Sequence, residues 1–253
     1  MDNSFLVEEA YNQEPGVVQH IFTTFYSVTR SAGHDEHAWA SAFTQEWPIF
    51  SQRHQFSYTI PWSNIDAGGR RQTDLNDVLL NYRYQVYLDP ESLTAFAPRF
   101  SLVLPTGDPL RGAGDDTVGY QLNLPFSTTL GDRVFVHANV GLTYLPEADS
   151  LQGRDALHYN LGASAIYALT SDVHLMLEWV GYWIEQTKGA GTTRALTAFL
   201  SPGVRKAFDF KRDMQLVLGV AVPVGLTRES PDWGVFAYVS FEHFFERPKK
   251  NLP

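Results

Sequence analysis

The 253-residue chain contains no cysteine, which excludes disulfides, thiolate metal sites and cysteine nucleophiles together. It also lacks any run of roughly 18 or more apolar residues, so it offers no candidate for a transmembrane helix. Lysine and arginine number 19 against 28 aspartate and glutamate residues, and the formal net charge is -9. Because phosphate binding requires a clustered basic surface, this balance argues against a nucleic-acid partner.

The segment MDNSFLVEEAYNQEPG at the start of the chain has neither the basic nor the apolar region of a secretory signal. We therefore expect either a cytoplasmic protein or a mature chain that begins after its signal was removed.

Nearly every part of the chain alternates between apolar and polar residues with a period of two. No stretch holds the i, i+3, i+4, i+7 apolar pattern that a helix needs. Most of the candidate strands exceed the ~5–6 residues of soluble sheets and suffice for the ~9–11 residues of a tilted strand that spans a bilayer. The sequence therefore predicts an all-β chain with strands over residues 17–30, 37–48, 53–63, 77–88, 93–105, 118–129, 133–145, 156–169, 173–185, 193–207, 213–226 and 233–245.

The connections between these strands alternate between long and short. SAGHDEH is followed by FSQR and TGDPLRGAGDDT by LGD, and the same order continues along the chain. Outer-membrane barrels have this asymmetry, with short periplasmic turns, longer outer loops and an even number of antiparallel strands. We therefore predict a transmembrane antiparallel up-and-down β-barrel of about twelve strands, with both termini in the periplasm.

The alternation separates an apolar face from a small, polar face. A soluble sandwich would alternate in the same way, so the position of the aromatic rings decides between the two. Trp62, Tyr144 and Tyr167 lie near the ends of apolar rows, as in the aromatic girdles of membrane barrels. We expect the apolar face to meet lipid and the polar face to line a lumen. A soluble sandwich or a lipocalin-like barrel is the alternative.

Several segments resemble landmarks of an outer-membrane transporter family that is catalogued under the phenol meta-cleavage (MetA) pathway. They are SFLVEEAYNQEPGVVQHI at 4–21, NDVLLNYRYQVY at 76–87, LVLPTGDP at 102–109, GAGDD at 112–116, LSPGVRKAF at 200–208 and the final GVFAYVSFEHFF. Where family members usually carry Gly-x-Gly-Asp before the fourth strand, this chain keeps the aspartate, Asp77, and lacks both glycines. The resemblance implies an outer-membrane barrel that passes small, aromatic or apolar molecules, and it supplies no catalytic residues.

Eight ionisable side chains fall on the inward face and are candidates for lining the lumen: Arg83, Arg99, Arg205, Glu178, Glu242, His137, His158 and His174. They are interpreted either as a selectivity lining in which the arginines face Glu178, or as an ion-pair network that fills and stiffens the barrel. Twelve strands enclose more space than the ~8 whose interior side chains can fill, and less than the ~16–18 of open porins. We therefore expect a narrow or plugged lumen.

The segment before the first strand is a candidate plug. Residues 1–16 are polar except for Phe5-Leu6-Val7, and the expected topology places them in the periplasm at the barrel mouth. The carboxylates that would reach lumen arginines are Glu8, Glu9 and Glu14. A frayed terminus is the alternative. The expected boundaries are 1–16 for this segment, 17–246 for the barrel and 247–253 for a C-terminal tail.

Two loop features have the side chains of a metal site but not a specific spacing. The first outer loop contains His34, Asp35, Glu36 and His37, whose imidazole and carboxylate groups suit Zn, Cu or Ni. Adjacent residues in a loop rarely converge on one ion, so we predict no metal site and interpret the cluster as a solvated loop. The loop carboxylates Asp108, Glu147 and Asp149 are candidates for bridging lipopolysaccharide phosphates through Ca, with simple solvation as the alternative.

The sequence thus predicts a passive outer-membrane channel whose partners are membrane lipids, lipopolysaccharide and a small solute. One alternative is a structural barrel that holds a protein partner, and another is an outer-membrane hydrolase. Such hydrolases place a Ser/His site on the lipid-facing side, whereas His158, Asn160 and Ser164 are expected to point inward. We therefore predict no enzymatic activity and no cofactor.

Overall fold

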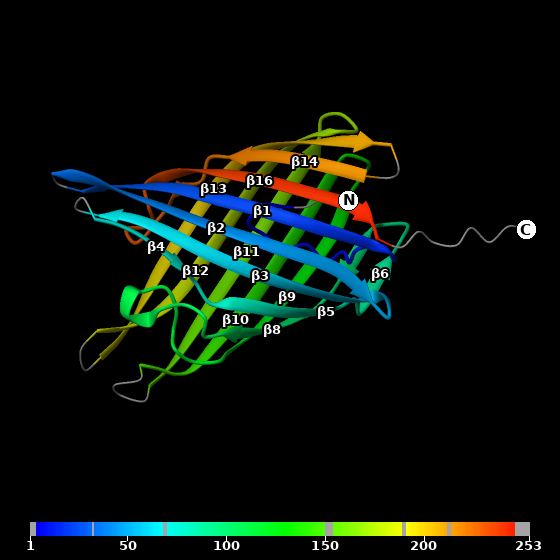
Figure 1. Ribbon diagram of the computed structural model, residues 1–253. Helices are drawn as coiled ribbons and strands as arrows, with labels where there is room; N and C mark the ends of the chain where they lie inside the picture. Colours follow the sequence, from blue (N-terminus) through cyan, green and yellow to red (C-terminus); the bar gives the residue numbers. More distant parts are fainter. Residues whose placement is uncertain are drawn as a thin grey trace, which may run out of the picture.

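The computed structural model describes residues 4–31, 33–67, 70–149, 154–188, 191–211 and 214–245, which form one sheet wrapped into a barrel (Figure 1). The expected tail 247–253 and residues 1–3 lie outside these ranges. The elements are β1 (Val17–Ser31), β2 (His34–Ile49), β3 (Ser51–Ala67), β4 (Arg70–Leu75), β5 (Val78–Tyr84), β6 (Tyr87–Asp89), β7 (Thr94–Phe96), β8 (Arg99–Leu104), the 3-10 turn η1 (Pro109–Arg111), β9 (Gly119–Leu130), β10 (Val134–Asp149), β11 (Arg154–Ala168), β12 (Val173–Lys188), β13 (Gly191–Phe210), β14 (Met214–Ala221), β15 (Val224–Gly225) and β16 (Trp233–Phe244). Among the described residues, no helix is long and apolar enough to cross a membrane.

Neighbouring strands pair antiparallel around the barrel, and the sheet closes because β1 pairs with β16 and β9 with β10. Three wall strands are interrupted. One consists of β4, β5 and β6, the next of β7 and β8, and the third of β14 and β15. Counted in this way, the described residues form twelve antiparallel wall strands, so the predicted all-β barrel is confirmed.

Prolines coincide with two of the three interruptions of the wall. Pro98 lies between β7 and β8, and Pro223 lies between β14 and β15. The carbonyl of each proline still accepts a hydrogen bond, from the N–H of Tyr84 at 3.0 Å and of Gly234 at 2.9 Å respectively. Proline has no N–H to donate, so the strand breaks at that residue while the adjacent strands continue.

The expected long loops at one end of the barrel are mostly paired strand instead. Ser31 pairs with His34, and Lys188 pairs with Gly191. The prediction of a long first outer loop is therefore wrong, because an antiparallel hairpin can continue its ladder past the barrel rim. Residues 105–118, which contain η1, do form a long irregular loop.

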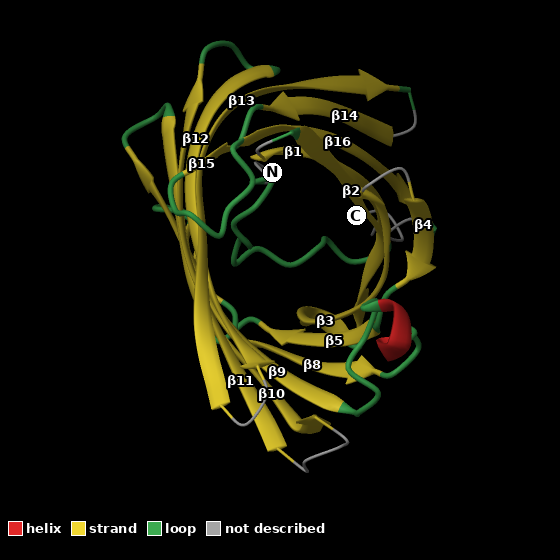
Figure 2. Ribbon diagram, turned by 90° about the vertical axis from the view of Figure 1, so that its left-hand side faces the viewer, coloured by secondary structure: helices red, strands yellow, loops and turns green. Residues whose placement is uncertain are grey.

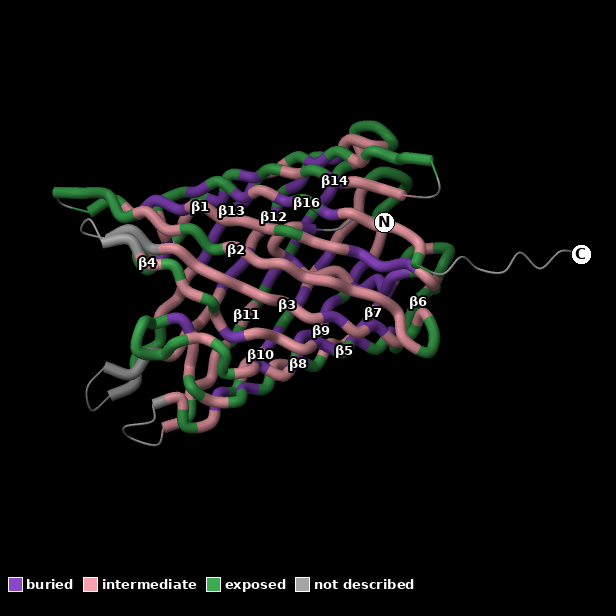
Figure 3. The backbone as a smooth tube through the Cα atoms, in the orientation of Figure 1, coloured by how far each residue is buried: buried purple, intermediate pink, exposed green. Residues whose placement is uncertain are grey.

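Side chains alternate between the outer surface and the interior along each wall strand. On β11, Leu161 and Tyr167 are exposed on the outside, whereas Ser164 and Ile166 on the opposite face are buried. Figure 3 shows this alternation of buried and exposed positions along the strands. The outer surface of β10 to β14 carries mainly aliphatic side chains, which is the apolar face that the sequence predicts.

The interior contains the N-terminal segment of the chain. Figure 2 shows it as a loop that crosses the inside of the barrel before β1 begins. Val7, Ala10, Tyr11, Asn12 and Gln13 within it are buried. Apolar side chains from the wall pack against it, including Ala95 and Ala97 beside Ala10 and Tyr11, and the core of the molecule therefore lies inside the barrel.

Candidate functional site in the barrel interior

Glu178 of β12 binds the tip of the N-terminal segment. Its Oε1 accepts hydrogen bonds from three successive backbone N–H groups, those of Phe5, Leu6 and Val7, at 3.1, 3.0 and 3.2 Å. Glu178 is fully buried, and Ser4 beside it donates to Ser164 Oγ at 2.9 Å. Three hydrogen bonds to one buried side-chain oxygen fix the tip to the β11–β12 wall.

Two arginines on the opposite wall bind the middle of the segment. Arg99 of β8 donates to Glu8 at 2.8 Å, and Arg83 of β5 lies 3.5 Å from the same carboxylate. Asn123 of β9 also donates to Glu8. Burial raises the pKa of Glu8, but the Arg99 and Arg83 guanidinium groups outweigh burial and hold this pKa below its ordinary value of 4.5. Glu8 is therefore a charged partner at neutral pH.

Arg83 also holds the backbone of the segment. Its Nη1 and Nη2 donate to the carbonyls of Glu9 and Tyr11 at 3.0 and 2.8 Å, and its Nε donates to Asn12 Oδ1 at 2.9 Å. Gln85 donates to the carbonyl of Ala10 at 2.6 Å. An arginine presents several donors in a fixed plane, so a single side chain bonds to several buried backbone carbonyls of the segment at once.

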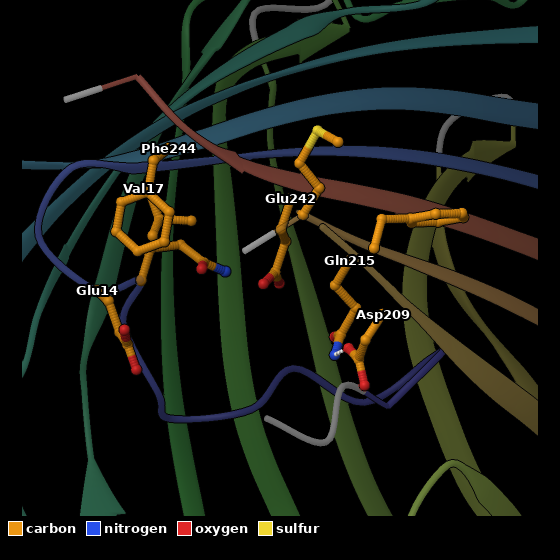
Figure 4. Close-up of a pocket in the computed structure, with 9 residues that line it drawn as sticks. Glu14, Val17, Asp209, Gln215, Glu242 and Phe244 are labelled. Atoms are coloured by element: carbon orange, nitrogen blue, oxygen red, sulfur yellow. Dashed lines mark hydrogen bonds between the residues drawn. The ribbon is translucent and has the colours of Figure 1, made fainter. Parts of the chain in front are cut away.

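Cavities remain on both sides of the segment. The mouth cavity, about 320 Å³, lies where β1 begins and β16 ends, and the carboxylates of Glu14, Asp209 and Glu242 line it (Figure 4). An outer cavity of about 390 Å³ lies at the other end, between Asp77, His158 and the loop 105–118. A smaller central cavity of about 210 Å³ separates residues 4–9 from Glu46 and Arg83. The segment thus lies between the mouth cavity and the outer cavity.

The eight expected lumen residues lie in different places. Arg83, Arg99 and Glu178 contact the N-terminal segment, and Glu242 and His158 line the mouth and outer cavities. Arg205 donates to His174 Nδ1 at 3.2 Å through Nε, and Ser127 Oγ lies 2.7 Å from His137 Nδ1. The arginines of β5 and β8 bind Glu8 rather than Glu178, because Glu178 accepts the backbone of residues 5–7.

The three glutamates of the expected plug also separate. Glu8 meets both arginines, whereas Glu9 meets Arg83 through its backbone carbonyl. Glu14 lies at the mouth cavity.

The cluster His34, Asp35, Glu36 and His37 lies in β2 rather than in a loop. Alternation along a strand sends neighbouring side chains to opposite faces, and His37 Nδ1 instead lies 2.8 Å from Tyr26 Oη. Among the described residues, no group of three or more His, Cys, Asp or Glu side chains is arranged to hold a metal ion.

Asp77 was singled out in the sequence only as a remnant of a family motif, and the structure shows what it contacts. Its Oδ1 accepts from Gly107 N at 2.9 Å and its Oδ2 from Asp115 N at 3.0 Å. A Cβ at Gly114 would lie 2.4 Å from Asp77 Oδ1, so this close approach requires glycine. Burial raises the pKa of Asp115, and the Asp77 carboxylate raises it further. Asp77 thereby connects the GDP and GAGDD motifs in one outer loop.

Sequence reasoning also missed a socket for Phe5. The Phe5 ring stacks on Phe236 and Tyr238 of β16, with centroids 5.7 and 5.2 Å apart. The apolar start of the segment was a visible signal, but its partners lie more than 200 positions away and nothing in the sequence pairs them with it.

A closed antiparallel barrel of twelve long strands with an aliphatic outer face defines the class of outer-membrane β-barrels. Solved structures agree with this fold. An outer membrane channel from Pseudomonas putida F1 has a TM-score of 0.70 and 14% identity, over 93% of this chain and 98% of that one. The NanC porin has a TM-score of 0.55 and 10% identity, over 90% of this chain and 100% of that one. The KdgM porin has a TM-score of 0.52 and 11% identity, over 90% of this chain and 99% of that one.

The family model described as "Putative MetA-pathway of phenol degradation" matches residues 8–242. The chain therefore belongs to this family, and the resemblance seen in its motifs is confirmed. No curated protein matches the chain.

Proposed function

We propose that this chain is a passive outer-membrane channel for small molecules and that residues 4–16 plug its lumen. The observation that carries the proposal is that the segment is bonded to both sides of the lumen. Arg99 of β8 pairs with Glu8 at 2.8 Å, and on the other side the tip bonds to Glu178 of β12. Because spaces of about 320 and 390 Å³ remain beyond the segment, its removal would join the two ends of the interior.

The outer membrane is the proposed location, with lipid and lipopolysaccharide around the aliphatic outer surface. Closure pairs the backbone groups of the wall, which hydrocarbon requires. We assign the end with the short turns to the periplasm, as in other barrels of this class. This orientation puts Gly16 and Phe245, at the two ends of the barrel chain, on the periplasmic side and makes the plug enter from there.

The lumen residues then have electrostatic roles that depend on the plug. With the segment docked, Glu8 neutralises Arg99 and part of Arg83. With the segment released, these arginines face an aqueous path together with Glu46, which lies 3.8 Å from Arg83. We propose that this set tunes selectivity in the open channel, with His158 and Glu242 at its two ends.

Two other functions are less consistent with the interior. A hydrolase would need an accessible nucleophile, but Ser127, which lies beside His137, is fully buried and bonded to Ala10 N. A barrel that holds a protein partner would need a free interior, whereas residues 4–16 of the same chain occupy it. Both observations support a channel.

A disulfide tether tests the proposal. Ser4 and Ser164 are in direct contact, their Oγ atoms 2.9 Å apart, and the natural chain has no cysteine to interfere. The variant S4C/S164C, oxidised, should hold the plug docked, and uptake of a five-carbon sugar in a liposome-swelling assay should fall to the level of empty liposomes. Reductant should restore wild-type uptake, and the single variants should not respond to it. A variant lacking residues 2–15 serves as the open reference.

If the oxidised double variant swelled the liposomes as fast as the open reference, the plug would not control passage. If the open reference itself gave no uptake while it showed the heat-modifiable gel migration of a folded barrel, the channel function would be wrong.

A further inference from the structure

The ring of Phe5 packs into a socket that side chains of the barrel wall form around it. Two aromatic rings of β16, Phe236 and Tyr238, flank it at an interplanar angle of 29° each. Ile21, Phe25 and Ala207 pack around the same cluster. The spacing of the ring centroids is that of favourable offset aromatic pairs. The socket is therefore shaped for one flat, apolar ring.

Glycine makes the floor of this socket. A Cβ at Gly219 of β14 would lie 2.1 Å from Phe5 Cζ, and a Cβ at Gly203 of β13 would lie 3.2 Å from Phe5 Cε2. A side chain at Gly219 would thus force the ring out of its present position. Glycine in a strand interior weakens the strand and often marks a place where another group approaches closely, which is what Phe5 does here.

The ring of Phe5 takes no part in the hydrogen bonds and ion pairs that hold the plug. Glu178 binds the backbone N–H of Phe5, and Arg83 and Arg99 bind residues 8–12, so none of these contacts uses the phenyl group. The socket is also next to the central cavity, because Tyr238 lines both and Phe5, which fills the socket, lines the cavity. A solute that crossed the lumen would pass this site.

From these contacts we propose that the socket is a binding site for a small monocyclic aromatic solute and that Phe5 is a built-in competitor for it. The solute displaces the ring of Phe5, which weakens the hold of the wall on the plug tip and couples binding to opening. The inference rests on the proposed channel function and adds to it a binding site and the coupling of that site to the plug.

The variant Phe5→Ala tests the proposal, with 4-fluorophenol as the probe and its fluorine NMR signal as the readout in lipid nanodiscs. Nanodiscs without protein provide the blank for partitioning into lipid. A tethered ring competes at an effective concentration on the order of millimolar, so its removal should tighten binding of the probe by about tenfold or more. Phe5→Leu is the matched control, because leucine keeps the socket filled, and it should bind the probe no better than wild type.

A side chain that fills the socket should remove the gain in probe binding that Phe5→Ala produces. In the Phe5→Ala background, Gly219→Leu should abolish the added binding, and heat-modifiable migration reports whether this double variant folds. Phenol should displace the probe from Phe5→Ala at a concentration about tenfold lower than cyclohexanol, because the saturated ring is thicker and has no π face.

Equal binding of the probe by Phe5→Ala and wild type would overturn the proposal, as would equal competition by cyclohexanol and phenol. If the double variant does not fold, the comparison of Phe5→Ala with Phe5→Leu still decides. These results are independent of the channel function, which stands or falls with uptake by the chain lacking residues 2–15.

Discussion

Glu178 concentrates three hydrogen bonds on one oxygen of one buried side chain. Glu178→Ala would leave the N–H groups of Phe5, Leu6 and Val7 without their acceptor. An unsatisfied buried donor costs about 1–3 kcal/mol, so the loss of even one of the three bonds should raise the undocked fraction of the plug between about fivefold and a hundredfold. The rate at which a Val7→Cys thiol reacts with a maleimide measures this fraction, since the chain has no other cysteine.

Glu185→Ala on the same strand is the matched control. Glu185 accepts from Leu157 N and pairs with Arg194, away from the plug, so its removal should leave the labelling rate of Val7→Cys unchanged. Equal rates for the two alanine variants would show that Glu178 does not hold the segment.

The charge of Glu8 gives docking a pH dependence. Its pKa is below 4.5 when docked, so its contribution is fully present above the undocked pKa near 4.5 and is lost as the pH falls through the docked value. Wild type should therefore open when the pH drops from about 7 to about 3, measured as open probability in planar bilayers. Glu8→Gln should be more open at neutral pH and respond less to acid. If Glu8→Gln opened in acid as much as wild type does, the acid-induced opening would be due to another group.

Among the elements, the outer loop 105–118 is held by side chains that lie outside it. Asp77 accepts from Gly107 N and Asp115 N, and the loop is also held by the ion pair of Arg111 with Asp74 at 2.8 Å. Asp77→Ala should release the loop and make the bond after Arg111 sensitive to trypsin, while the barrel stays folded. Glu91→Gln, in a short turn at the other end, is the control. If Asp77→Ala resisted trypsin at this bond, the loop would keep its packing without the Asp77 carboxylate.

The wall strands were predictable from the sequence, whereas the route of residues 4–16 was not. Alternation is a local property, so Leu161 and Gly162 show their outward and inward faces without knowledge of the fold. The bonds of Val7 and Tyr11 join residues 171 and 82 positions apart, and no periodic pattern records them. For the same reason the motif aspartate Asp77 was visible, but its role as the cap of a distant loop was not.

The lengths of the hairpins could not be predicted from the local sequence either. Residues 34–36 read as a polar loop, yet they continue β2 because β1 offers them a paired backbone. Whether a polar stretch pairs depends on its neighbour as much as on its own composition.

The molecule as a whole has an aliphatic outer surface and a polar interior, which the N-terminal segment occupies. Leu161, at the middle of β11, is exposed on the outside, so Leu161→Arg should destabilise the barrel in lipid vesicles by about 2–4 kcal/mol. Thr143→Arg is the control, because Thr143 lines the outer cavity, where a charged side chain can stay hydrated. Unfolding in guanidinium measures both. Equal destabilisation of the two variants would mean that the outer surface does not meet hydrocarbon.

Single-channel conductance in planar bilayers tests the central claim most directly, with the full chain compared with a variant lacking residues 2–15. A plug that crosses the lumen predicts a full chain that is closed for most of the time and a truncated chain with steady conductance. Equal conductance of the two proteins, with both folded, would contradict the claim that this segment closes the channel.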